Sequence, residues 1–119
     1  QLEPVTPELL AEVVRRIVAA IDPDKIILFG SYAHGTPHEW SDVDLFIIKS
    51  GSYSKFDLQG KVDSLFWDMS LPMDVLVRTP EAVERMAADP TNPFVRREVL
   101  EKGKVIYERG KPINTATVL

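Results

Sequence analysis

Residues 25–48 read KIILFGSYAHGTPHEWSDVDLFII, and the two apolar runs within this segment decide the fold. The first run, residues 25–29, is short and nearly continuous, which is typical of a strand buried on both faces. Gly30-Ser31 ends it, and a polar loop over residues 34–41 leads to the second run, residues 42–48. We therefore predict two strands whose connection carries a glycine, a serine and several polar side chains.

Strands and helices alternate along the rest of the chain. Apolar residues recur at helical spacing after Thr6-Pro7, an N-cap residue followed by a proline that suits the first helical position. The same patterns predict further strands at residues 73–77 and 105–107 and further helices at residues 58–69, 80–86 and 93–103. This order predicts an α/β sheet of three or four strands and leaves open whether the sheet is parallel or mixed.

The composition fits one compact domain. The chain has 119 residues, 45% of them apolar, and its acidic residues outnumber its basic residues by 18 to 14. We expect a single domain over residues 1–119, with a motif core at 25–78, C-terminal helices at 80–103 and a flexible tail at 108–119. The net charge of −4 argues against direct binding of nucleic acid through its phosphates.

The sequence also excludes several kinds of site. The chain has no cysteine, which rules out disulfides, thiolate zinc sites and cysteine nucleophiles. No apolar run approaches the length of a membrane span, and no signal peptide is recognisable. We therefore expect a cytoplasmic location and no membrane partner.

Three aspartates fall within the predicted strands. Because side chains alternate along a strand, Asp42 and Asp44 point to the same face, and Asp74 lies in the next predicted strand. Carboxylates on an otherwise apolar face repel one another unless a cation lies between them, and oxygen ligands favour Mg²⁺ or Mn²⁺. We predict that all three are metal ligands, in an arrangement that suits a two-metal site. The alternative, that each only ends a strand in water, explains one such residue more easily than three.

Gly30-Ser31 supplies a complementary feature. A glycine directly after a buried strand permits a tight turn and a close approach of the backbone to a ligand. If residues 31–33 open a short helix, their free N–H groups and the Ser31 hydroxyl face an anion. Considered alone, a plain turn explains Gly30-Ser31 equally well. Its position just before the paired acids favours a phosphate site.

These residues together resemble the signature of the minimal nucleotidyltransferases, antitoxin-type members of the DNA polymerase β superfamily. Gly30-Ser31 is followed, after ten residues, by Asp42-x-Asp44, and Asp74 falls where that family places its third carboxylate. The resemblance implies the polymerase β-like nucleotidyltransferase fold. That fold is a small mixed sheet of three to four strands with helices packed mainly on one face.

The resemblance also implies a chemistry and a role for each motif residue. ATP would be the substrate and Mg²⁺ the metal, with Mn²⁺ as a substitute. Asp42, Asp44 and Asp74 would be the catalytic and metal-binding residues, and Asp74 would help to activate the attacking hydroxyl. Gly30 and Ser31 would bind the outer phosphates of the nucleotide.

The motif departs from its usual form at one position. Many relatives carry an arginine where this chain has Tyr32, so a different cation would have to meet the triphosphate. Lys61, Arg78 or a residue of a partner could substitute, and His34 is a further candidate for a phosphate contact.

Three functions remain as hypotheses at this stage. Small members of the family often work with a helical HEPN-type toxin, and some transfer AMP to a tyrosine of that toxin, which makes a protein adenylyltransferase the leading hypothesis. A transferase acting on a small molecule such as an aminoglycoside is the second, and a non-catalytic, toxin-neutralising partner is the third. Either a homo-oligomer or a hetero-oligomer is compatible with the sequence.

The remaining aromatic and apolar side chains are assigned mainly to packing. Phe66 and Trp67 are predicted to lie in the core. Trp40 is predicted to pack at the base of its loop, with stacking on a nucleobase as the alternative. Phe46 and Ile48 share the face of the acids and would form an apolar patch for a partner or a base unless the chain's own helices cover them.

Overall fold

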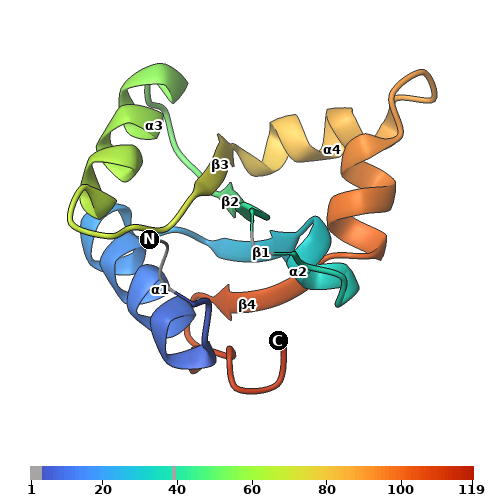
Figure 1. Cartoon of the computed structure of the whole chain (residues 1–119). Coiled ribbons are helices and arrows are strands. Elements are labelled where there is room, and N and C mark those ends of the chain that lie inside the picture. The colour runs from blue at the N-terminus through green and yellow to red at the C-terminus, as the bar shows by residue number, and fades with distance from the viewer. Residues whose placement is uncertain (1–3, 39) are drawn as a thin grey trace.

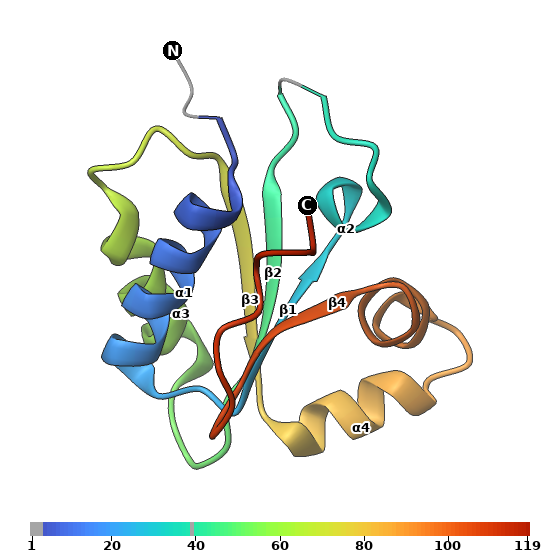
Figure 2. The same ribbon diagram turned by 90° about the horizontal axis from the view of Figure 1, so that it is seen from below.

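The computed structural model describes residues 4–38 and 40–119, and its centre is a mixed four-stranded sheet (Figures 1 and 2). The strands lie in the order β3-β2-β1-β4. Their bounds are β1 (Lys25–Phe29), β2 (Val43–Ile48), β3 (Met73–Arg78) and β4 (Lys104–Glu108). β1 pairs antiparallel with β2 and β4, whereas β2 and β3 are parallel. The predicted α/β class is confirmed, and the sheet is mixed.

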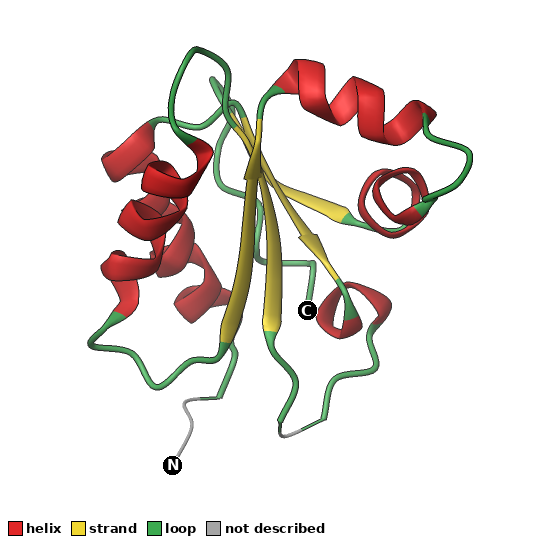
Figure 3. Cartoon of the chain, turned by 90° about the horizontal axis from the view of Figure 1, so that it is seen from above, coloured by secondary structure: helices red, strands yellow, loops and turns green. Residues whose placement is uncertain are grey.

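One face of the sheet is covered by α1 (Pro7–Ile21), α3 (Lys55–Asp63) and the short 3-10 helix η1 (Ser64–Phe66) (Figure 3). α1 begins as its sequence predicts, because the Thr6 side chain accepts a hydrogen bond of 3.1 Å from the Leu9 N–H and Pro7 follows at the first position. Its apolar stripe is buried against the inward-facing residues of β1, β2 and β3, which form the larger core cluster. The spacing of apolar residues thus determines how this layer packs.

The opposite face is covered as well, by α4 (Pro80–Ala88) and a π-helical segment, η2 (Val95–Glu101) (Figure 3). Phe46 from β2 is fully buried there, in a second core cluster with Val83 and Val99. The resemblance implies helices mainly on one face, whereas the structure has helices on both faces. Because these helices cover Phe46 and partly cover Ile48, the acidic face carries no open apolar patch at these residues.

The C-terminal segment packs against the body of the protein, so the prediction of a flexible tail is wrong. Val118 and Thr115 are buried, and the Thr115 hydroxyl donates a 2.9 Å hydrogen bond to the Pro7 carbonyl. The Asn114 N–H donates a 2.9 Å bond to the carbonyl of Ile106 in β4. Burial of apolar surface together with these bonds offsets the entropy of ordering the tail.

None of the helices within residues 4–38 and 40–119 has the length and apolar character that a bilayer crossing requires.

Candidate active site

The candidate site lies at the end of the sheet where β1 finishes and where β2 and β3 begin. In the register of the sheet, Phe29 pairs with Asp44, and Asp44 pairs with Asp74 on the parallel neighbour β3. Gly30 follows Phe29 directly. The structure therefore places Gly30, Asp44 and Asp74 in a row across three adjacent strands, with Asp44 in the middle.

Gly30 is required at its position for two separate reasons. Its φ of +76° lies in the left-handed region, which residues other than glycine rarely adopt. A Cβ atom added there would also overlap the carboxylate of Asp44. The glycine thus lets the backbone turn directly against the central acid.

The turn at Gly30 leads straight into the short helix α2 (Ser31–His34), which meets the condition that residues 31–33 open a helix. Gly35 ends α2 in the left-handed conformation, with φ +73°. Ser31 is therefore the first residue of a helical turn that starts beside Asp44. Whether Ser31 contacts phosphate stays a prediction.

Asp44 is the electrostatic centre of the site. Its carboxyl is half-buried, and that burial raises its pKa to about 6, with further contributions from the negative charges of Asp74 and Asp42. Within the described residues, no hydrogen-bond donor or cation compensates this charge. A carboxylate crowded by two others and left without a partner is a site where a bound cation is strongly favoured.

The donor set fits a hard divalent cation, since all three candidates are carboxylates. Asp44 and Asp74 are direct neighbours across β2 and β3, whereas Asp42 is exposed and precedes β2. Across the described parts of the chain, no three acidic or histidine side chains already converge on one metal position. Binding would therefore require the exposed side chains of Asp42 and Asp74 to rotate toward Asp44.

Arg78 and Lys61 are sequence-based candidates for the cation that contacts the triphosphate in place of the missing arginine. Arg78 is paired with Ile48 at the opposite end of the sheet from the acids, and its guanidinium donates 2.8 Å to the Val77 carbonyl. Lys61 belongs to α3, which covers the face opposite to the Asp44 side chain. Neither position favours the residue as a substitute for the missing arginine, although Arg78 lines the same hollow as Asp74.

His34 ends the helical turn that begins at Ser31, and its imidazole lies 3.4 Å from the Glu98 carboxylate. Glu98 belongs to η2 and also pairs with Lys102 at 3.3 Å. This contact ties α2 to the helical layer on the acidic face. Glu98 gives no signal in the sequence, because it lies far along the chain from the motif.

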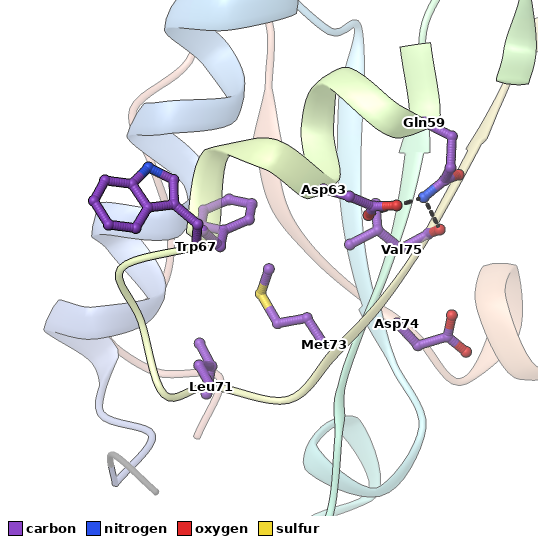
Figure 4. A pocket seen from close by; sticks show the side chains of 8 residues that line it. Gln59, Asp63, Trp67, Leu71, Met73, Asp74 and Val75 are labelled. Atoms are coloured by element: carbon purple, nitrogen blue, oxygen red, sulfur yellow. Dashed lines mark hydrogen bonds between the residues drawn. The ribbon is translucent and has the colours of Figure 1, made fainter. Parts of the chain in front are cut away.

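Two hollows flank Asp74 at the outer edge of β3. The first, of about 350 Å³, is bordered by α3, η1 and the start of β3 (Figure 4). Trp67 lies on one side of it and Asp74 on the other. The second, of about 380 Å³, continues along β3 and includes Phe56, Asp74 and Arg78 in its lining.

The exposed aromatic residues differ from their predicted packing. Trp67 is 87% exposed, although Phe66 beside it is buried as predicted. Trp40 is 70% exposed, so the prediction that it packs at its loop base is wrong. Phe56, which has no distinctive sequence context, is 85% exposed.

Comparison with known proteins places this geometry in a family. The family model described as polymerase beta nucleotidyltransferase matches residues 12–112. A candidate protein adenylyltransferase of Methanocaldococcus jannaschii is 35% identical over 83 residues, which cover 70% of this chain and 77% of that protein.

Solved structures show the same fold. A candidate nucleotidyltransferase from Sulfolobus solfataricus has a TM-score of 0.65 at 19% identity and covers 90% of this chain and 84% of its own. A toxin–antitoxin structure with AMP-PNP has a TM-score of 0.52 at 20% identity, and a mutant of the toxin–antitoxin MntA-HpeT has 0.51 at 18%. These two alignments each cover 89% of this chain and 76% of the matched chain. The motif, the fold and the family model agree: this chain belongs to the polymerase beta nucleotidyltransferase family and is a nucleotidyltransferase.

Proposed function

We propose that this protein transfers AMP from ATP to a hydroxyl group of a partner protein, most directly to a tyrosine of a helical HEPN-type toxin for which it acts as the antitoxin. The observation that carries the proposal is the row of Gly30, Asp44 and Asp74 across three strands. Such a row provides a place for phosphate at one end and for an acceptor at the other.

Each residue of the row has a separate role in the proposed transfer of AMP. The oxygen of the acceptor hydroxyl forms a bond to the α-phosphorus of ATP, while the bond from that phosphorus to the oxygen of the β-phosphate breaks. Pyrophosphate leaves on the side of Gly30 and Ser31, and the hydroxyl proton passes to a carboxylate, for which Asp74 is the candidate. In-line geometry requires entry and departure on opposite sides of phosphorus, which matches the positions of Asp74 and Gly30 about Asp44.

Asp42, Asp44 and Asp74 would hold Mg²⁺, or Mn²⁺ in its place. When bound, the metal neutralises the charge of the triphosphate and of the three acids. Asp44 needs that neutralisation most, because its carboxyl is half-buried and adjoins two other acids. The chain's own contribution is to keep the three carboxylates at one end of the sheet, so that ATP and the acceptor meet in a fixed orientation.

A protein acceptor is supported by two comparisons. The relative that is 35% identical carries the name of a candidate protein adenylyltransferase. Two structures with the same fold are toxin–antitoxin structures, one of them with AMP-PNP. We extend these properties to the present chain as part of the proposal.

Intact mass spectrometry tests the proposed function. The purified chain is incubated with ATP, Mg²⁺ and a purified helical HEPN-type toxin, and the toxin is then weighed. We expect additions of one or more AMP groups that disappear with Asp42→Ala and persist with Glu84→Gln, an exposed acid on α4. An unmodified protein together with AMP transfer to an aminoglycoside would favour the small-molecule enzyme. Tight binding without any transfer would favour the non-catalytic antitoxin.

A further inference from the structure

The row of Gly30, Asp44 and Asp74 fixes the direction from which an acceptor approaches. This step rests on the proposed function. If pyrophosphate departs over Gly30, the attacking hydroxyl must come from the side of Asp74. Asp74 lies on β3, which is the outermost strand of the sheet. The acceptor therefore crosses the outer edge of β3 to reach the site.

That edge is hollowed on both sides of the third carboxylate. The hollow of about 350 Å³ reaches from Trp67 and Leu71 to Asp74, and the one of about 380 Å³ reaches from Asp74 to Phe56. Gln59, Asp74 and Val75 line both, so the two hollows adjoin at Asp74 and extend from it in opposite directions along the edge of the sheet. We call this feature the β3 groove.

Two large aromatic side chains stand at the ends of the β3 groove. Phe56 is 85% exposed and Trp67 is 87% exposed. Exposed aromatic residues beside a depression are typical anchors of protein–protein interfaces, because they bury a large area at a small cost in conformational entropy.

Two backbone carbonyl groups of the edge strand β3 already accept hydrogen bonds from side chains, which bears on how a partner would bind. The Gln59 amide donates 2.5 Å to the Val75 carbonyl, and Arg78 donates 2.8 Å to the Val77 carbonyl. These bonds occupy groups that an added β-strand would need. These bonds favour binding through side chains over strand addition.

The charges along the β3 groove differ between its two ends. Asp63 lines the hollow at the Trp67 end, and Lys55 and Arg78 line the hollow at the Phe56 end. A bound segment that has basic residues toward Trp67 and acidic residues toward Phe56 would match both ends and would lie in one direction only.

We propose that the β3 groove is the docking surface for the acceptor protein, with Phe56 and Trp67 as the anchors on either side of the hydroxyl presented to Asp74. The occupant is a surface segment of a partner protein that has an apolar side chain on each side of its acceptor hydroxyl and opposite charges at its two ends. Its specificity comes from these flanking contacts, so they affect a protein acceptor and leave a small acceptor unaffected.

Two substitutions at exposed positions test the docking surface. Phe56→Ser and Trp67→Ser remove the anchors, and Leu100→Ser on η2 is the matched control, since Leu100 is also exposed and lies outside the β3 groove. The acceptor probes are a purified helical HEPN-type toxin and N-acetyl-tyrosinamide, which has a hydroxyl but no flanking surface. Calorimetric binding of the protein probe without ATP is measured separately from AMP transfer.

We expect each anchor substitution to weaken binding of the protein probe at least tenfold and to lower kcat/KM for that probe by a similar factor. Transfer to N-acetyl-tyrosinamide, Mg²⁺-dependent binding of ATP and the Leu100→Ser control should be unchanged. Unchanged binding of the protein probe, an equal loss with both acceptors, or no binding by the wild-type chain would overturn the docking inference. Weakened binding without any AMP transfer by the wild type would instead support docking and refute the proposed enzymatic function.

Discussion

Asparagine in place of Asp44 should stabilise the metal-free protein at neutral pH while abolishing its activity. The carboxyl has a pKa of about 6 in the folded protein against 3.8 as its ordinary value. A difference of about two pH units corresponds to about 3 kcal/mol, and solvent screening of this half-exposed group reduces it to about 1–2 kcal/mol. Because the folded pKa is raised, the wild-type protein loses this stability as the pH rises from about 4 to about 6.

Asp44→Asn has no carboxyl group at this position to ionise. Its stability relative to the wild type should therefore increase over the same pH range. Urea unfolding followed by circular dichroism in EDTA, at pH 4 and pH 7.5, measures the difference at both ends. We expect Asp44→Asn to gain about 1–2 kcal/mol on the wild type between the two pH values. Mg²⁺ added at pH 7.5 should stabilise the wild type and have little effect on the variant. A difference that is the same at both pH values, or a lower stability of the variant at pH 7.5, would refute the assignment of Asp44 as an uncompensated buried charge.

Three further predictions follow from the same geometry. ATP should bind appreciably better with Mg²⁺ than in EDTA, since the clustered acids repel a triphosphate; equal affinities in calorimetric titrations would argue against the metal site. Gly30→Ala should lower stability by about 1–3 kcal/mol and remove activity, because its φ is +76° and its Cβ would overlap Asp44; a thermal melt like that of the wild type would contradict this. Removal of residues 113–119 exposes the surface that Thr115 and Val118 cover and should cost about 2–3 kcal/mol in urea unfolding, whereas a flexible tail would cost almost nothing.

The strands and the motif geometry could be predicted from sequence because their determinants are local. The apolar run of β1 matches its predicted bounds, and Thr6-Pro7 starts α1 where expected. Side chains alternate along β2, so Asp44 and Phe46 point to one face of the sheet and Leu45 to the other. The face on which Asp44 lies could therefore be predicted. The pairing of Asp44 with Asp74 depends on strand register, which the sequence implied only through the family resemblance.

The predictions that differ from the structure concern features that depend on contacts between distant parts of the chain. The change from α3 to the 3-10 turn η1 buries Phe66 and leaves Trp67, the residue that follows the turn, pointing outward. Phe46 is covered by α4 and η2, whose docking side is not specified by their spacing alone. The contact between His34 and Glu98 joins distant parts of the chain and could not be read from either segment.

The central claim is that Asp44 directs the transfer of the α-phosphate of ATP, with its adenosine, to an acceptor protein. The most direct measurement compares ATP labelled at the α-phosphate with ATP labelled at the γ-phosphate, using a purified helical HEPN-type toxin as acceptor in Mg²⁺. We predict that the acceptor gains the α label and not the γ label, that pyrophosphate is released in equal amount, and that Asp44→Asn abolishes the labelling. Incorporation of the γ label, or α labelling that survives Asp44→Asn, would contradict the account.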